Sequence, residues 1–193
     1  GNFPTGTDNV ALGNAALNGE SFSGSGNIAI EDSVGDATTS GTNAVAIGRD
    51  ALGGVYTGSD AIGIGRSALA ALTSGSNNVA IGALAGTSLT EGLQNVLIGA
   101  NAGDALNDDD FNVAIGQSDL TGDTKGSRSV AIGHGALSVQ NFTSATNSNN
   151  TAVGFSAGEN VTTGIENTLI GASSGDALTV GSSNVGVGLF ALT

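Results

Sequence analysis

The sequence predicts an all-β fold: a parallel β-solenoid or β-roll in which eleven repeats of about 17 residues stack along one axis. Three observations predict it. A glycine returns at a nearly constant spacing, a Val-Ala-Ile type triplet stands before it, and an Ala-Leu or Ala-Gly pair follows it. Repeats of this length are typical of stacked arrays in which each unit contacts only its neighbours.

The repeating unit reads approximately Gly-x-x-Asn-Val-Ala-Ile-Gly-x-x-Ala-(Leu/Gly). We number its columns from the glycine that closes the Val-Ala-Ile-Gly core, which is position 0. Most successive position-0 residues are 17 apart, and the two longer steps measure 18 and 21 residues. The position-0 residues are Gly13, Glu31, Gly48, Gly65, Gly82, Gly99, Gly116, Gly133, Gly154, Gly171 and Gly188. Eleven copies fill residues 1–193, which we interpret as a single repeat domain.

Positions −3 to −1 alternate between β-branched and small residues, as in Val79-Ala80-Ile81. Alternation with a period of two in β-branched residues is typical of a short β-strand. We expect positions −3 and −1 to face a core. Position −2 is expected to face a close neighbour that tolerates only small side chains.

Glycines predict the turns. Position −7 is glycine in nine copies, and the exceptions are Asp109 and Asn147, residue types that tolerate a positive φ. We therefore expect a left-handed residue at position −7. The position-0 glycine is expected to make a second bend or to let another backbone approach closely. Glu31 breaks the position-0 column and predicts a locally irregular coil.

A second apolar segment follows position 0. Position +3 is Ala in most copies, position +4 is Leu or Gly, and position +7 is often apolar, as at Val55, Leu72 and Leu89. Stacking makes the core continuous, but it is thin and rich in Ala and Gly, so each coil buries little apolar surface. This shortage favours several chains packed side by side as a homotrimer, with the small position −2 row at or near the contact.

Position −4 is asparagine in eight of the eleven copies. In register, their side-chain amides can donate to and accept from the next coil, which predicts a structural ladder. A ladder that seals the entrance to the strand is favoured over a row that binds a ligand. The eight residues are Asn9, Asn27, Asn78, Asn95, Asn112, Asn150, Asn167 and Asn184.

Composition and charge exclude several classes of function. The net charge is −13 with only four Lys and Arg residues, so nucleic-acid binding, which relies on these cations, is not expected. The absence of Cys excludes disulfides and thiolate metal sites. No run approaches the roughly 20 apolar residues needed to cross a bilayer, so no membrane insertion is expected within this segment. We interpret the chain as a fragment or processed product of a longer one.

Catalytic and metal-binding candidates are few. His134 is the sole histidine and lies at position +1, a column so varied that it predicts a solvent-facing side chain rather than a general base. We therefore expect no enzyme activity and no resident cofactor. The acidic turn Asp108, Asp109 and Asp110 could hold Ca²⁺ through oxygen ligands, although a solvated turn is the favoured interpretation.

The longest departure from the repeat is a four-residue insertion before Gly154, within residues 138–149. Insertions in repeat arrays map to loops, often on a binding face. We expect Phe142 to be an exposed aromatic suited to stacking on a sugar ring, with Asn141 and Thr143 beside it in a ligand loop. An inert loop is the competing interpretation.

The repeat resembles those of two related groups of proteins. The segment Thr73–Gly86, which reads TSGSNNVAIGALAG, resembles the head repeats of trimeric autotransporter adhesins. Asn150-Thr-Ala-Val-Gly154 is similar to the 17-residue units of phage tail fibres and tail-fibre-like surface proteins, which is the closer likeness. The resemblance covers the full chain and implies a homotrimeric parallel β-roll or prism used as an adhesive head or fibre shaft.

The expected function is therefore that of a structural fibre or adhesin-type repeat protein. Such a chain would form an elongated stalk, extracellular, at the cell surface or on a virion, for surface attachment. Its expected partners are other copies of itself and a cell-surface glycan or receptor. The alternative is a self-polymerising extracellular filament or matrix subunit.

Overall fold

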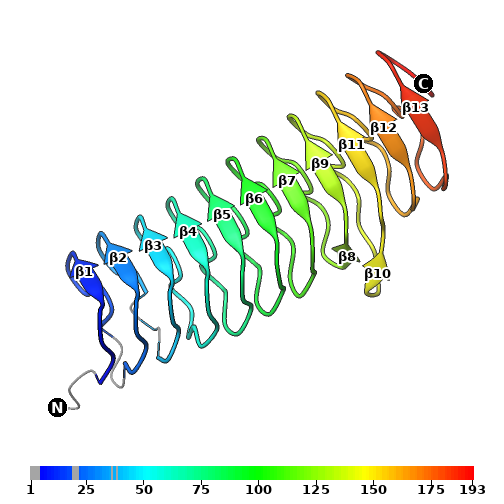
Figure 1. Cartoon of the computed structure of the whole chain (residues 1–193). Coiled ribbons are helices and arrows are strands. Elements are labelled where there is room, and N and C mark those ends of the chain that lie inside the picture. The colour runs from blue at the N-terminus through cyan, green and yellow to red at the C-terminus, as the bar shows by residue number, and fades with distance from the viewer. Residues whose placement is uncertain (1–4, 19–21, 36, 38) are drawn as a thin grey trace.

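A computed structural model describes residues 5–18, 22–35, 37 and 39–193. It confirms the predicted fold, an all-β parallel solenoid whose coils repeat at a spacing of about 17 residues. The coils form one elongated stack, with the two chain termini at its opposite ends (Figure 1). The described residues contain no helix, and so none that is long and apolar enough to span a membrane.

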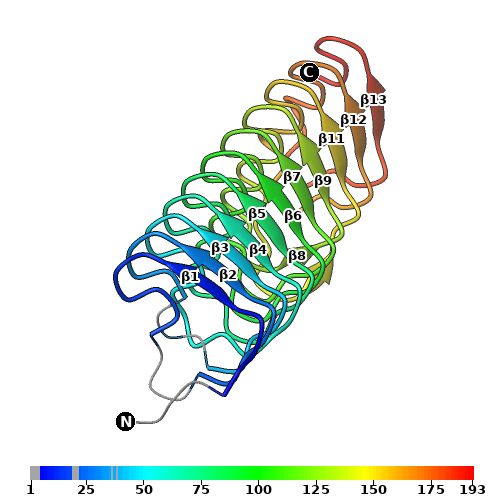
Figure 2. The same cartoon turned by 60° about the vertical axis from the view of Figure 1, so that its left-hand side comes forward.

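One sheet of eleven parallel strands runs along a single side of the stack (Figure 2). Neighbouring strands are in register, so that Val79 pairs with Val96 and Ile81 with Ile98. The strands, in spatial order, are β1 (Val10–Leu12), β2 (Ile28–Ile30), β3 (Val45–Ile47), β4 (Ile62–Ile64), β5 (Val79–Ile81), β6 (Val96–Ile98), β7 (Val113–Ile115), β9 (Val130–Ile132), β11 (Thr151–Val153), β12 (Thr168–Ile170) and β13 (Val185–Val187). A separate pair joins β8 (Gly126–Ser127) to β10 (Thr146–Asn147).

The position-0 residue bends the chain out of each strand, as predicted. Its φ ranges from +106° at Glu31 to +155° at Gly133, a region that L side chains rarely adopt. The next coil also approaches closely here, because a Cβ on Gly99 would lie 2.3 Å from the carbonyl oxygen of Gly116. Both halves of the expectation for position 0 are confirmed.

The expectation for position −7 is wrong, because none of its glycines has a positive φ. Glycine is needed there for space, since a Cβ on Gly75 would lie 2.3 Å from the carbonyl oxygen of Gly92 in the next coil. The left-handed residues stand at positions −5, +2 and +4, as at Asn77, Leu84 and Gly86. The conformation at +4 explains why that column accepts glycine as readily as leucine.

The predicted strands are confirmed, but their orientation is the reverse of the expectation. Position −2 faces the interior of the solenoid, where Ala80 and Leu97 are fully buried. Positions −3 and −1 point outward, and Ile81 is 37% exposed. The interior of each coil is narrow, so small residues line it and bulky β-branched residues stand outside. The position −2 row therefore cannot be the contact between chains.

The core is a continuous column between the sheet and the returning half of each coil. It consists of position −2 together with the buried residues at +3, +4 and +7, such as Ala85, Leu69 and Leu89. Val55 departs from the prediction for +7, because it is 54% exposed and Tyr56 fills the core instead. The reason is local: the Tyr56 amide donates to the carbonyl of Gly54 in a tight turn that advances the chain by one residue.

Candidate functional site

The most extensive feature of the surface is an apolar strip along the outside of the sheet. We call it the outer face and define it as positions −3 and −1 of the eleven strands. Most of its Val and Ile side chains are half-buried, because each packs against its equivalents in the coils above and below. Several remain more open, including Ile28 at 38% and Ile170 at 41%. Nothing within the described chain covers this face.

The asparagines of position −4 lie inside the solenoid and are hydrogen-bonded from coil to coil. Asn95 donates its backbone N–H to Asn78 Oδ1 at 2.9 Å and its Nδ2 to the carbonyl of Asp109 at 2.7 Å. Its own Oδ1 accepts the backbone N–H of Asn112 at 2.9 Å. The interior asparagines are fully buried, Asn150 and Asn167 among them, so this ladder joins coils and presents no surface to a large ligand.

A polar network replaces the apolar core in two adjacent coils. Asp123 and Gln140 stand at position +7 and are fully buried, and Gln140 Nε2 donates to Asp123 Oδ2 at 2.5 Å. Gln140 Nε2 also reaches Ser129 Oγ at 3.1 Å, and Asn150 Nδ2 donates to Gln140 Oε1 at 2.6 Å. Burial raises the pKa of Asp123, and the Gln140 hydrogen bond opposes that rise.

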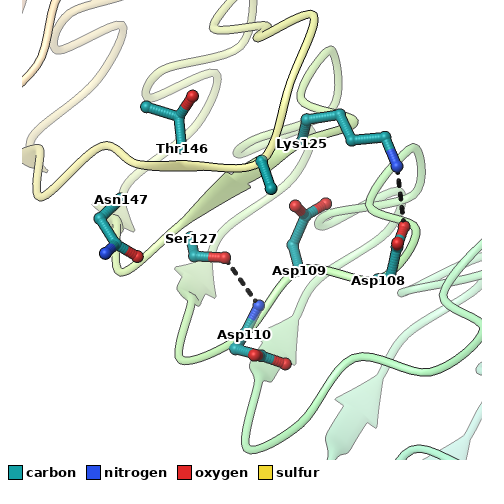
Figure 3. Close-up of a pocket in the computed structure, with 8 residues that line it drawn as sticks. Asp108, Asp109, Asp110, Lys125, Ser127, Thr146 and Asn147 are labelled. Carbon is teal, nitrogen blue, oxygen red and sulfur yellow. Dashed lines mark hydrogen bonds and ion pairs between the residues drawn. The ribbon is translucent and has the colours of Figure 1, made fainter.

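A polar pocket of about 310 Å³ opens beside this network, where β8 pairs with β10 (Figure 3). Lys125 Nζ bonds Asp108 Oδ1 at 3.0 Å across its rim. Asp109 is buried and accepts the Asn107 amide at 3.2 Å. Burial is the largest cause that raises the pKa of Asp109, to about 7, and the Asn107 amide opposes it. The pocket is lined by Asp108, Asp109, Asp110, Lys125, Ser127, Ala145, Thr146 and Asn147.

The three aspartates of this turn do not converge on one point. Asp108 turns to Lys125, Asp109 turns inward, and Asp110 Oδ1 accepts the backbone N–H of Leu93 at 2.7 Å. Across the described ranges, no three Asp, Glu or His side chains lie close enough together to hold a metal ion. Calcium binding at Asp108, Asp109 and Asp110 therefore stays a prediction without support from the geometry.

The insertion folds back onto the stack instead of forming an exposed ligand loop. Phe142 is only 6% exposed, so the expectation of an exposed aromatic for sugar stacking is wrong. Backbone pairing explains its burial, because the Asn141 amide donates to the carbonyl of Thr162 and the Thr146 amide to the carbonyl of Lys125. Asn141 and Thr143 remain exposed beside it.

His134 is exposed, as its varied column predicted, and stacks on Phe155 with ring centroids 5.4 Å apart. The buried carboxylate of Asp119, in the preceding coil, accepts the backbone amides of Gly133 and Ala136 at 3.0 and 2.7 Å. Burial raises the pKa of Asp119, and these amides oppose the rise. Asp119 thus ties one turn to the next instead of orienting His134 as a base.

Two features of the site escaped the sequence analysis. The buried Asp119 and Asp123 had a visible signal, because each replaces an apolar residue in an otherwise regular column. The outer face had none, since alternation does not reveal which side of a strand faces inward. Comparison of the chain with protein-family models, curated proteins and solved structures finds no match.

Proposed function

We propose that this chain forms the shaft of a homotrimeric fibre, outside a cell or on a virion, that serves attachment to another surface. It acts through shape and binding and not as an enzyme, and the attachment target is a cell-surface glycan or receptor. The observation that carries the proposal is the outer face, because eleven in-register strands present Val and Ile along the whole rod with nothing over them.

The size of the outer face favours a partner of the same length. Eleven strands about 4.8 Å apart, each about 10 Å long, give an area of roughly 500 Å². Contiguous apolar patches on soluble monomers rarely exceed a few hundred Å², and larger ones mark interfaces. A second copy of this chain has the same coil spacing, so its face matches this one along the full rod.

Three copies fit the width of the face. Packed sheets lie about 10 Å apart, which places each sheet roughly 5 Å from a shared threefold axis. A triangular prism with that inner radius has sides of about 17 Å, the reach of roughly five extended residues. The stretch from position −5 to position 0 has this length, so three chains would enclose their Val and Ile side chains in one dry core.

The test is the solution mass, measured by light scattering on a size-exclusion column. We expect three times the chain mass of 18.5 kDa. The double variant Ile81→Asp/Ile98→Asp, which places charges on the outer face, should be monomeric with an unchanged far-UV spectrum. Ser74→Glu, at an exposed position away from the strands, is the control and should remain trimeric. A monomeric wild-type chain overturns the proposal.

A self-polymerising filament is the second candidate, and the last coil is the observation that favours it. Leu189 and Phe190 are 69% and 58% exposed there, and a Cβ on Gly188 would meet no atom within 4 Å. Another copy stacked end to end would continue the coils. This candidate predicts a mass that grows without limit as chain concentration rises, whereas the trimer has a constant mass.

A further inference from the structure

Two exposed columns border the outer face. Position −5 precedes each strand and position +1 follows it, so the strand runs from one border to the other. In the coil that contains β4, these positions are Asp60 and Arg66, and both are exposed. The two borders of one coil therefore carry opposite charges.

The charge of Arg66 has no partner within the described chain. The ion pairs found there join Arg49 to Asp50 at 3.9 Å and Lys125 to Asp108 at 3.0 Å. Asp60 accepts a hydrogen bond from Asn43 Nδ2 at 3.2 Å through one oxygen, Oδ1. An exposed carboxylate and an exposed guanidinium thus stand on opposite borders at the same height along the rod.

A closed ring of parallel copies brings these borders together. Around a rotation axis parallel to the rod, contacts are head-to-tail, so the +1 border of one copy meets the −5 border of the next. The rotation adds no shift along the axis, so residues of the same coil meet. A fibre with one anchored end and one distal end needs its chains to run in the same direction.

We propose that the copies assemble in parallel and in register, with Arg66 of one copy paired to Asp60 of the next around the ring. This inference rests on the proposed homotrimer. The apolar outer faces supply the association, and the charged borders select its direction and register, which is the usual role of charge at the rim of an interface. In an antiparallel pair, by contrast, this coil would lie opposite the coil of β9, and Asp60 would meet Arg128.

Engineered disulfides test the arrangement, and the natural absence of cysteine makes the result unambiguous. The variant Asp60→Cys/Arg66→Cys should form covalent trimers on oxidation, seen on a non-reducing gel, because every copy offers both halves of the bond. Neither single variant should form covalent trimers. The variant Asp60→Cys/Arg128→Cys is the antiparallel control and should not crosslink.

Charge variants provide a second test that needs no disulfide. Arg66→Asp places like charges at each border and should raise the chain concentration at half-dissociation about tenfold. Asp60→Arg/Arg66→Asp should restore it, and Arg128 shows that position −5 accepts arginine with a positive φ. Both measurements use light scattering over a dilution series.

The outcomes separate this inference from the function on which it rests. A monomeric wild-type chain overturns both. A trimer that neither crosslinks through positions 60 and 66 nor responds to the charge swap overturns only the register. Covalent dimers from Asp60→Cys/Arg128→Cys would replace the parallel ring by an antiparallel pair.

Discussion

At the scale of single residues, the rod depends on polar side chains that cross from one coil to the next. Asn95 connects three coils, because it bonds Asn78 on one side and the backbone of Asp109 and Asn112 on the other. A buried backbone group left without a partner costs about 1–3 kcal/mol. The asparagine ladder is therefore a main source of specificity for the coil register.

Replacement of Asn95 by alanine should lower the free energy of unfolding by about 2–4 kcal/mol, because the Asp109 carbonyl and the Asn112 amide lose their partner. Chemical unfolding followed by far-UV circular dichroism measures this. Asn14→Ala is the control, since Asn14 is exposed and its side chain makes no hydrogen bond within the described residues. Equal effects of the two substitutions would contradict a structural role for the ladder.

Buried carboxyl groups make the stability depend on pH. Burial raises the pKa of Asp109 to about 7, and the pKa values of Asp119 and Asp123 are raised as well. Between the ordinary pKa near 3.8 and about 7, the folded chain then binds more protons than the unfolded chain. Stability is therefore complete at low pH and falls as pH rises through 7.

Wild-type protein should accordingly have a higher Tm at pH 5 than at pH 8, by several degrees. Asp109→Asn should reduce this difference, because asparagine cannot ionise and already occupies the same column at Asn147. Thermal scans at both pH values measure the effect. The variant also controls for the overall charge of −13, whose repulsion changes with pH in both proteins. An undiminished difference in Asp109→Asn would show that Asp109 is not the group responsible.

At the scale of the coil, position 0 combines two demands on one glycine. Gly99 has a φ of +135° and admits no Cβ against Gly116. Gly188 has a similar φ of +124° but has no neighbouring coil on that side. The two glycines therefore separate the cost of the backbone conformation from the cost of the close approach.

We expect Gly99→Ala to destabilise the protein by about 3 kcal/mol or more, since it adds a steric clash to an unfavourable φ. Gly188→Ala should cost about 1 kcal/mol, because only the conformational term remains. Equilibrium unfolding of both variants gives the comparison. If the two losses are equal, close packing of successive coils contributes nothing to the requirement for glycine.

The repeat determines which elements could be predicted. The strands, their parallel stacking and the bend at position 0 follow from spacing and residue type, as at Val79–Ile81 and Gly99. The direction of the side chains does not, because alternation is the same whichever side is inside. Position −7 shows a second limit: a required glycine can mark a lack of space as well as a left-handed turn, as at Gly75.

The polar pocket was predictable only in part. Asp108, Asp109 and Asp110 are conspicuous in the sequence, but Lys125 lies in the next coil and Thr146 in the inserted segment. They meet the aspartates only through stacking. The insertion was recognised as a loop, but its length did not reveal that backbone pairing of β10 with β8 would draw Phe142 inward.

At the scale of the whole molecule, stability is close to a sum over coils and the contacts between them. Strand pairs such as β5 with β6 and β6 with β7 have the same parallel register. A coil removed from the middle should therefore leave its neighbours able to pair directly. The rod would become shorter by one step without a change of fold.

Deletion of residues 83–99 removes one unit of 17 residues and joins Gly82 to Ala100, so that β5 can pair with β7. We expect the far-UV spectrum per residue to be unchanged and the free energy of unfolding to fall by about 1–3 kcal/mol, the share of one coil. Deletion of residues 84–99 is the matched control, because it leaves a coil one residue short. The native stack accommodates longer coils, with steps of 18 and 21 residues, but contains none of 16. The shorter coil must sacrifice one of its three left-handed turn residues or shift a strand so that outward Val and Ile face the narrow interior. At equal chain concentration the control should therefore unfold at a much lower temperature. If both deletions are tolerated equally, the 17-residue period is not what holds the coils in register.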